Sequence, residues 1–145
     1  MSYLVVPFKR WHLNWLEDRG AAEGGSGPVL SFDMLRQLEH ENSWTGVYDG
    51  DPIACGGTIR HWPGRHLAWA HLNANTARHM TFITRAAREA IARAHGRVEI
   101  TVRAGFKPGL RWARLLGFAI ENAPGLLEGY GPEGETHIAH VRFNG

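Results

Sequence analysis

The 145-residue sequence contains a single cysteine, Cys55, so no disulfide can form within the chain. This fits a reducing compartment, or a protein that does not depend on redox state. No window approaches the roughly 20 apolar residues of a membrane-spanning helix. The apolar run at residues 3–8 stops at Lys9 and Arg10, follows no basic stretch and is too short for a secretory signal. These absences predict a soluble, cytoplasmic protein with no membrane partner.

An excess of charge is also lacking, because 16 basic and 14 acidic residues leave a net charge of +2. That is far from the basic excess of a typical nucleic-acid-binding domain, which argues against nucleic acid as a partner. Phosphate-loop and dinucleotide-binding glycine motifs are absent. Among nine histidines only His137 and His140 are closely spaced, and on a strand they point to opposite faces. No metal site is therefore predicted.

The composition that remains is that of one ordinary globular domain, with 43% hydrophobic and 21% charged residues. A chain of this length can bury roughly two thirds of its unfolded surface, which suffices for a core. No internal repeat and no linker divides the sequence. We therefore expect a single domain over residues 1–145.

The first half of the chain predicts a strand, two helices and then three strands joined by two hairpins. A Gly-rich loop is expected at 20–28, and Asp49-Gly50 is a strong hairpin signal. Gly56-Gly57 inside a predicted strand indicates a bulge or a close approach of two backbones. The predicted elements are a strand at 3–8, a helix at 9–19, a helix at 32–41 capped by Ser31, and strands at 44–48, 52–60 and 66–73.

In the second half of the chain, the spacing of the apolar residues changes. Alanine and isoleucine recur at helical spacing over 76–94, with Asn75 or Thr76 as the expected N-cap. A second helix is expected to begin at Pro108 and to end at Gly117. The predicted strands of this half are 97–103, 118–122 and 137–143. Hairpins followed by a strand–helix–strand crossover imply an α/β fold, a mixed sheet with helices on both faces.

The element order and the segment RWARLLGFAIEN, residues 111–122, resemble the GNAT family of N-acetyltransferases. In that family a short helix commonly ends in Leu-Gly-Phe, here residues 116–118, and a strand follows at once. The resemblance implies a GNAT-like α/β fold: a mixed, mostly antiparallel twisted sheet of about six to seven strands flanked by about four helices. The sequence also resembles, more loosely, small GNAT proteins encoded by tailed phages.

The resemblance implies acetyl-coenzyme A as co-substrate, held where strand 66–73 leads into a helix N-terminus. The family motif there has Gln or Arg, two residues, Gly, one residue, then Gly or Ala. This sequence departs from it, because Asn75 takes the first position and Arg78 and Met80 replace the two small residues. The cofactor-binding residues that follow from the resemblance are Leu72, Asn73, Ala74, Asn75, Thr76, Ala77, Arg78, His79, Met80 and Thr81.

Two side chains are candidate bases for deprotonating an acceptor amine. His71 lies on the strand that leads into the cofactor loop, and its alternative role is a half-buried histidine satisfied by its neighbours. Glu99 lies on the polar face of its strand, and its alternative role is an ion pair with Arg97 or Arg103. Both readings remain open for each residue.

The tyrosine that would act as general acid according to the resemblance is missing. Many GNAT enzymes have a tyrosine four residues before the Gly of Leu-Gly-Phe, and here that position is Ala113. Tyr130 can substitute as the catalytic acid or can be an ordinary surface aromatic. Trp112, beside Ala113, and Glu128, in a loop with other acidic residues, are the expected substrate-binding residues. An acidic loop suits a cationic acceptor amine, with a protein lysine as one candidate.

The sequence leaves two functions open. One is transfer of an acetyl group from acetyl-coenzyme A to a primary amine. The alternative is a catalytically degenerate GNAT-like binding protein, phage-encoded, that docks on and modulates a host enzyme or serves as a virion component. A homodimer is compatible with either. Four tryptophans can anchor such an interface or fill the core, namely Trp11, Trp15, Trp44 and Trp62.

Overall fold

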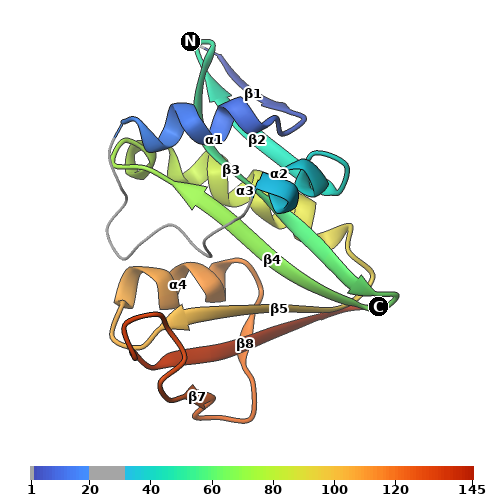
Figure 1. The fold of residues 1–145 in the computed structure, drawn as a ribbon, viewed down its shortest axis with the longest axis vertical. Helices are drawn as coiled ribbons and strands as arrows, with labels where there is room; N and C mark the ends of the chain where they lie inside the picture. The colour runs from blue at the N-terminus through green and yellow to red at the C-terminus, as the bar shows by residue number, and fades with distance from the viewer. Residues whose placement is uncertain (1, 20–31) are drawn as a thin grey trace.

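A mixed sheet of eight strands forms the centre of the computed structural model, which describes residues 2–19 and 32–145 (Figure 1). The strands are β1 (Tyr3–Val6), β2 (Asn42–Tyr48), β3 (Asp51–Trp62), β4 (Arg65–Leu72), β5 (Gly96–Arg103), β6 (Ala119–Ile120), β7 (Leu126–Leu127) and β8 (His137–Asn144). The helices of the described residues are α1 (Arg10–Glu17), α2 (Phe32–Leu38), α3 (Met80–Ala92), α4 (Lys107–Leu115) and the 3₁₀ helix η1 (Thr76–His79).

The strand order is β1-β2-β3-β4-β5-β8-β6, with β7 also paired to β8. Every pairing is antiparallel except that of β4 with β5. The predicted mixed, mostly antiparallel α/β fold is therefore confirmed. The sheet has eight strands rather than six or seven, because no local pattern indicates the two-residue strand β7. No described helix is long and apolar enough to cross a membrane.

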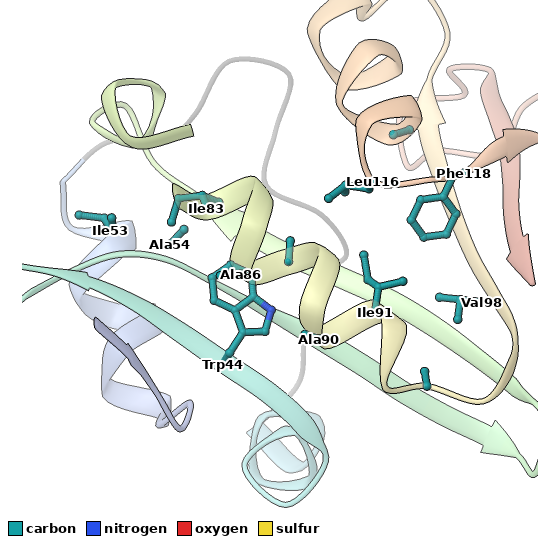
Figure 2. Close-up of a cluster of buried hydrophobic side chains, with 13 residues drawn as sticks. Trp44, Ile53, Ala54, Ile83, Ala86, Ala90, Ile91, Val98, Leu116 and Phe118 are labelled. Carbon is teal, nitrogen blue, oxygen red and sulfur yellow. The ribbon is translucent and has the colours of Figure 1, made fainter. Parts of the chain in front are cut away.

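Helices cover both faces of the sheet. The larger core cluster joins α3 and α4 to one face, and the alanines of α3 allow it to pack closely there (Figure 2). A smaller cluster joins α1 and α2 to the other face. Neighbouring residues divide between the two, because Ala54 belongs to the first cluster and Cys55 to the second. The buried alanine stripe of the predicted helix 76–94 is thus confirmed.

Two glycine signals are confirmed in the hairpin of β2 and β3. Asp49 and Gly50 both have positive φ angles, of 48° and 88°, as a tight turn between antiparallel strands requires. Gly57 marks a close backbone approach, because a Cβ there would lie 2.3 Å from the main-chain oxygen of Asn42.

Gly117 ends α4 with φ at 92°, the expected left-handed cap.

Other sequence predictions need correction. The predicted helix 76–94 is divided into η1 and α3. Asn75 occupies the N-cap position of η1, as predicted, but neither it nor His79 at the start of α3 makes a side-chain cap hydrogen bond. The side chain of Thr76 turns inward instead, where it donates to the main-chain oxygen of Ile53 at 2.7 Å. The predicted loop 20–28 and the Ser31 cap lie outside the described residues.

The four tryptophans singled out in the sequence differ in burial. Trp44 is buried in the larger core cluster. Trp11 and Trp62 are 55% and 56% exposed, and Trp15 is half-buried with the guanidinium of Arg19 over its ring. Only Trp44 of these four is therefore a core residue.

Candidate functional site

A wedge opens between β4 and β5, the two parallel strands. They are paired at only three positions, the last of which joins Leu67 to Glu99. Beyond it, β4 stays paired with β3 through Leu72, and β5 stays paired with β8 through Arg103. The strands lie side by side near the C-terminus and diverge toward the other end (Figure 1). Main-chain N–H and C=O groups on the facing edges at 68–72 and 100–103 are therefore available to a ligand.

The loop after β4 lies at the open end of the wedge and is held by its own side chains. The side-chain oxygen of Asn73 accepts the main-chain N–H of Asn75 at 2.9 Å. The hydroxyl of Thr76 accepts the main-chain N–H of Asn73 at 2.9 Å, and the amide of Asn73 donates to the main-chain oxygen of Leu16 in α1. Asn73 and Thr76 are buried, so they fix the loop rather than offer contacts to a ligand.

Positive electrostatic potential gathers where this loop enters η1 and α3. Neither helix start is capped by a side chain, so their first N–H groups present the positive end of the helix dipole. Arg78 is exposed and has no hydrogen-bond or ion-pair partner in the described chain. His79 bonds the Tyr3 hydroxyl at 2.9 Å, and desolvation, together with the charge of Arg78, lowers its pKa. An anion fits this position better than a cation.

The ten residues predicted for the cofactor separate by exposure. Ala74, Asn75, Ala77, Arg78 and Thr81 are exposed, and Leu72, His79 and Met80 are half-buried. Met80, in place of a small residue of the family motif, packs against the larger core cluster. Its bulk is therefore directed at least partly into the protein, which leaves the helix start accessible.

His71 lies on the part of β4 that borders the wedge. It is half-buried and is opposite Cys55 in the register with β3. Alternation along the strand puts it on the same face as Trp69, the face covered by α1. The indole N–H of Trp69 is buried without a hydrogen-bond partner in the described part of the chain. A buried donor without a partner is rare in folded proteins.

Glu99 is held in an ion-pair network at the closed end of the wedge. Its carboxylate accepts two hydrogen bonds from Arg65, at 2.7 and 2.9 Å, and one from Arg97. Arg97 in turn binds Glu121. The hydrogen bonds from Arg65, with those from Arg97, lower the pKa of Glu99 to about 2. A carboxylate so stabilised is a weak base, and this arrangement favours the ion-pair role that the sequence also allowed.

The lowered pKa of Glu99 implies that the free energy of unfolding depends on pH. Its folded value of about 2 lies below the unfolded value of about 4.5, so its contribution is complete above pH 4.5 and is lost as the pH falls toward 2. We expect Glu99→Gln to lower the free energy of unfolding at pH 7 by about 2 kcal/mol. Urea unfolding should show a smaller loss between pH 4.5 and pH 2.5 in this variant than in wild type. An unchanged pH dependence would contradict the assignment, and Glu89→Gln, on an exposed position of α3, is the control.

Tyr130 and Glu128 lie in the segment between β7 and β8, and both are exposed. The ring of Tyr130 is 5.2 Å from that of His137. His137 joins two further groups, since its Nδ1 is 3.2 Å from the Thr101 hydroxyl and its Nε2 is 3.3 Å from Glu135. The register pairs Arg103 with His137, so this cluster belongs to the diverging end of β5. Glu128 has no contact with it that the structure records.

Trp112 and Ala113 lie on α4. Ala113 is buried in the larger core cluster, where the resemblance has a tyrosine. The indole N–H of Trp112 donates to the Thr84 hydroxyl at 2.9 Å and so ties α4 to α3. Trp112 therefore positions two helices, and the structure records no free polar group on it for a substrate.

Cys55 was expected to be a core residue, and His137 and His140 were expected to point to opposite faces of a strand. Cys55 is fully buried, and desolvation raises the pKa of its thiol, which suits a core residue rather than a nucleophile. His137 contacts Thr101, whereas His140 is buried and bonds the main-chain oxygen of Ile138. Their positions opposite residues 103 and 100 of β5 confirm that they point to opposite faces.

Sequence reasoning missed the cluster of Glu135, His137 and Thr101, and also the unpartnered Trp69. Glu135 and His137 are two residues apart, a spacing that puts both side chains on one face of an extended chain. Thr101 joins them only through the pairing of β5 with β8, which no local pattern reveals. Trp69 carried no signal beyond its place in a strand.

The overall fold is similar to that of several known structures. Ard1 from Thermoplasma volcanium superposes with a TM-score of 0.72 at 12% identity, over 99% of both chains. A chain of the NatC complex bound to Gag peptide and CoA gives a TM-score of 0.71 at 14% identity, over 97% of this chain and 98% of that one. The ribosomal-protein-S18-alanine N-acetyltransferase from Escherichia coli gives 0.62 at 11%, over 97% and 92%.

The fold is therefore that of the GNAT N-acetyltransferases, as the sequence resemblance implied. No protein-family model matches the sequence, and no curated protein is similar to it in sequence. Identities of this size establish the fold alone, so function rests on the site.

Proposed function

We propose that this protein binds acetyl-coenzyme A in the wedge and transfers its acetyl group to a primary amine. The observation that carries the proposal is the separation of β4 from β5 beyond Leu67, directly before an uncapped helix start. The exposed edge of β4 offers main-chain groups to a thioester-bearing chain. The N–H groups of η1 and α3, with Arg78, offer a site for its pyrophosphate.

The chemistry needs one bond made and one broken. The acceptor nitrogen bonds to the acetyl carbon, the C–S bond breaks, the amine loses a proton and the sulfur gains one. We assign the first proton transfer to His71, on the wedge-bordering part of β4. We assign the second to Tyr130, beside His137, because the usual tyrosine position is Ala113. Two structures of similar fold support an amine acceptor: the NatC complex bound to Gag peptide and CoA, and the ribosomal-protein-S18-alanine N-acetyltransferase.

Isothermal titration calorimetry with acetyl-coenzyme A and with coenzyme A tests the cofactor site. We expect micromolar binding of both, and Arg78→Glu should weaken it at least about tenfold because it replaces an attractive charge by a repulsive one. Arg85→Glu, at an exposed position one turn into α3, should bind like wild type and controls for net charge. Equal affinity of the Arg78 and Arg85 variants would contradict the assignment of the pyrophosphate site.

A binding protein that has lost catalysis is the second candidate. Two observations favour it: the acid position is a buried alanine, and Trp112 ties α4 to α3. The same titration distinguishes the two functions. Absence of binding to either nucleotide would favour the binding protein, and affinity capture of a protein partner would then be the next experiment.

A further inference from the structure

A cavity of about 360 Å³ lies on the α3 face of the sheet, at the closed end of β4. Its floor comes from three neighbouring strands, because the register pairs Asn42 of β2 with Thr58 of β3, and Arg60 of β3 with His66 of β4. Arg93, just after α3, forms part of the rim. The wedge opens at the other end of β4, beyond Leu67. The cavity is therefore separate from the proposed acetyl-coenzyme A site.

The wall of this cavity is fixed by hydrogen bonds. The amide of Asn42 donates to the Thr58 hydroxyl at 3.1 Å and to the main-chain oxygen of Ala90 at 2.7 Å. The side-chain oxygen of Asn42 accepts a bond from Arg93 Nε at 3.3 Å. Asn42 thus links β2, β3 and the end of α3, and it orients Arg93 toward the cavity rim.

His66 provides an unmet hydrogen-bonding group. Its side chain lines the cavity, only 9% of the residue is exposed, and its Nδ1 has no partner among the described residues. Buried polar atoms in folded proteins nearly always have a partner. His66 is therefore a polar residue of the cavity lining whose buried Nδ1 is not satisfied within the described residues.

The charges around the cavity favour an anion. Arg60 is exposed and forms no hydrogen bond or ion pair within residues 2–19 and 32–145, so its five donors are available. The terminal nitrogens of Arg93 have no hydrogen-bond partner among the described residues, since its bond to Asn42 uses Nε. Glu41 is the one carboxylate in the lining, and it accepts a bond from Gln37 at 3.4 Å. Two guanidinium groups thus face one carboxylate.

The end of α3 does not oppose an anion here. A helix C-terminus is normally negative because its last carbonyls lack partners. The carbonyl of Ala90 is bonded by Asn42, and those of Ile91 and Ala94 are bonded by the side chain of Asn144, at 2.9 and 2.7 Å. These bonds reduce the negative potential that the cavity would otherwise meet.

We propose that this cavity binds a small molecule carrying a phosphate group. A phosphate has enough oxygens to meet the guanidinium groups of Arg60 and Arg93 at once, whereas a carboxylate has only two. The volume exceeds that of inorganic phosphate and falls within the range of small-molecule sites, so it leaves room for an organic part. This site assigns the protein a second ligand, and it does not depend on acetyl transfer.

Histidine side-chain NMR tests the proposal. The protein is titrated with inorganic phosphate, with glucose 6-phosphate and with succinate, and the His66 ring signals are assigned by their loss in His66→Gln. We expect saturable shifts of these signals with both phosphates, tighter binding of the sugar phosphate, and at least about tenfold weaker binding of succinate.

Single-residue variants locate the ligand. Arg60→Gln and Arg93→Gln should each weaken phosphate binding at least about tenfold. Arg85→Gln, on an exposed position of the same helix as the cavity rim, should bind like wild type. Thermal unfolding of each variant controls for folding, and exposed arginines are expected to leave it unchanged. Absence of His66 shifts with both phosphates, equal affinity for succinate, or an unaffected Arg60 variant would each overturn the proposal. None of these outcomes depends on the acetyl-coenzyme A titration.

Discussion

Replacing Gly57 by alanine is expected to destabilise the fold by about 3 kcal/mol or more. A Cβ on this residue would lie 2.3 Å from the main-chain oxygen of Asn42 and 2.8 Å from the Cα of Ser43. Both atoms belong to the backbone of β2, which pairs with β3 at this point. No side chain can rotate away, so the two strands must separate and lose part of their hydrogen bonding. Urea unfolding followed by circular dichroism measures the loss.

The matched control is Gly64→Ala in the turn between β3 and β4. Gly64 has φ at 92° and nothing within 4 Å of a Cβ, so alanine meets backbone strain but no clash. It should cost only about 1 kcal/mol. Similar losses for the two variants would show that the close approach of β2 and β3 is not what requires glycine at position 57.

Local chemistry explains which elements the sequence predicts well. The glycine pair in β3 predicts a close backbone approach and Asp49-Gly50 predicts a tight turn, and the structure confirms both. The alanine stripe of α3 predicts its buried face because one helix face must meet the sheet. The helical segment begins at Thr76 after Asn75, as predicted, but no side chain caps it. Thr76 has the residue type of a cap, but a buried main-chain oxygen of β3 takes its hydroxyl.

Contacts between residues that are distant in the chain could not be predicted from the sequence. Glu99 was expected to pair with Arg97 or Arg103, and it pairs with Arg97 and with Arg65. Arg65 comes within reach only because β4 and β5 are parallel neighbours at their paired end. The contact of Thr101 with His137 likewise depends on the register between β5 and β8. The fold class follows from local patterns, whereas such contacts follow from strand pairing.

The proposed pyrophosphate site combines a family geometry with different side chains. Glycines in the family motif let the backbone approach a phosphate. Here Asn73 and Thr76 hold the loop through hydrogen bonds, and Met80 packs onto the core. The helix start is thus kept accessible by fixing the loop rather than by removing side chains. This is the physical reason to test binding by charge at Arg78 rather than by restoring glycines.

Replacing His71 by glutamine is expected to lower kcat for acetyl transfer at least about 100-fold, while affinity for acetyl-coenzyme A stays within about twofold. His71 is half-buried on the wedge-bordering part of β4, on the face shared with Trp69, so an acceptor amine approaching from the α1 side meets it. Glutamine keeps the size and hydrogen bonding of the side chain but cannot take the proton. Release of the coenzyme A thiol, measured with peptide and polyamine acceptors, gives kcat and KM.

Tyr130→Phe gives the comparison that separates the two proton transfers. Tyr130 is 57% exposed, so water can supply the proton that the phenol would give to the sulfur, and kcat should fall only about tenfold. His95→Gln, at an exposed position after α3, should leave both constants unchanged. If His71→Gln keeps its kcat while a substitution at His137 lowers it, the base lies in the cluster of Glu135, His137 and Thr101 instead. That cluster is at the diverging end of β5, so the amine would then approach the same wedge from its other strand.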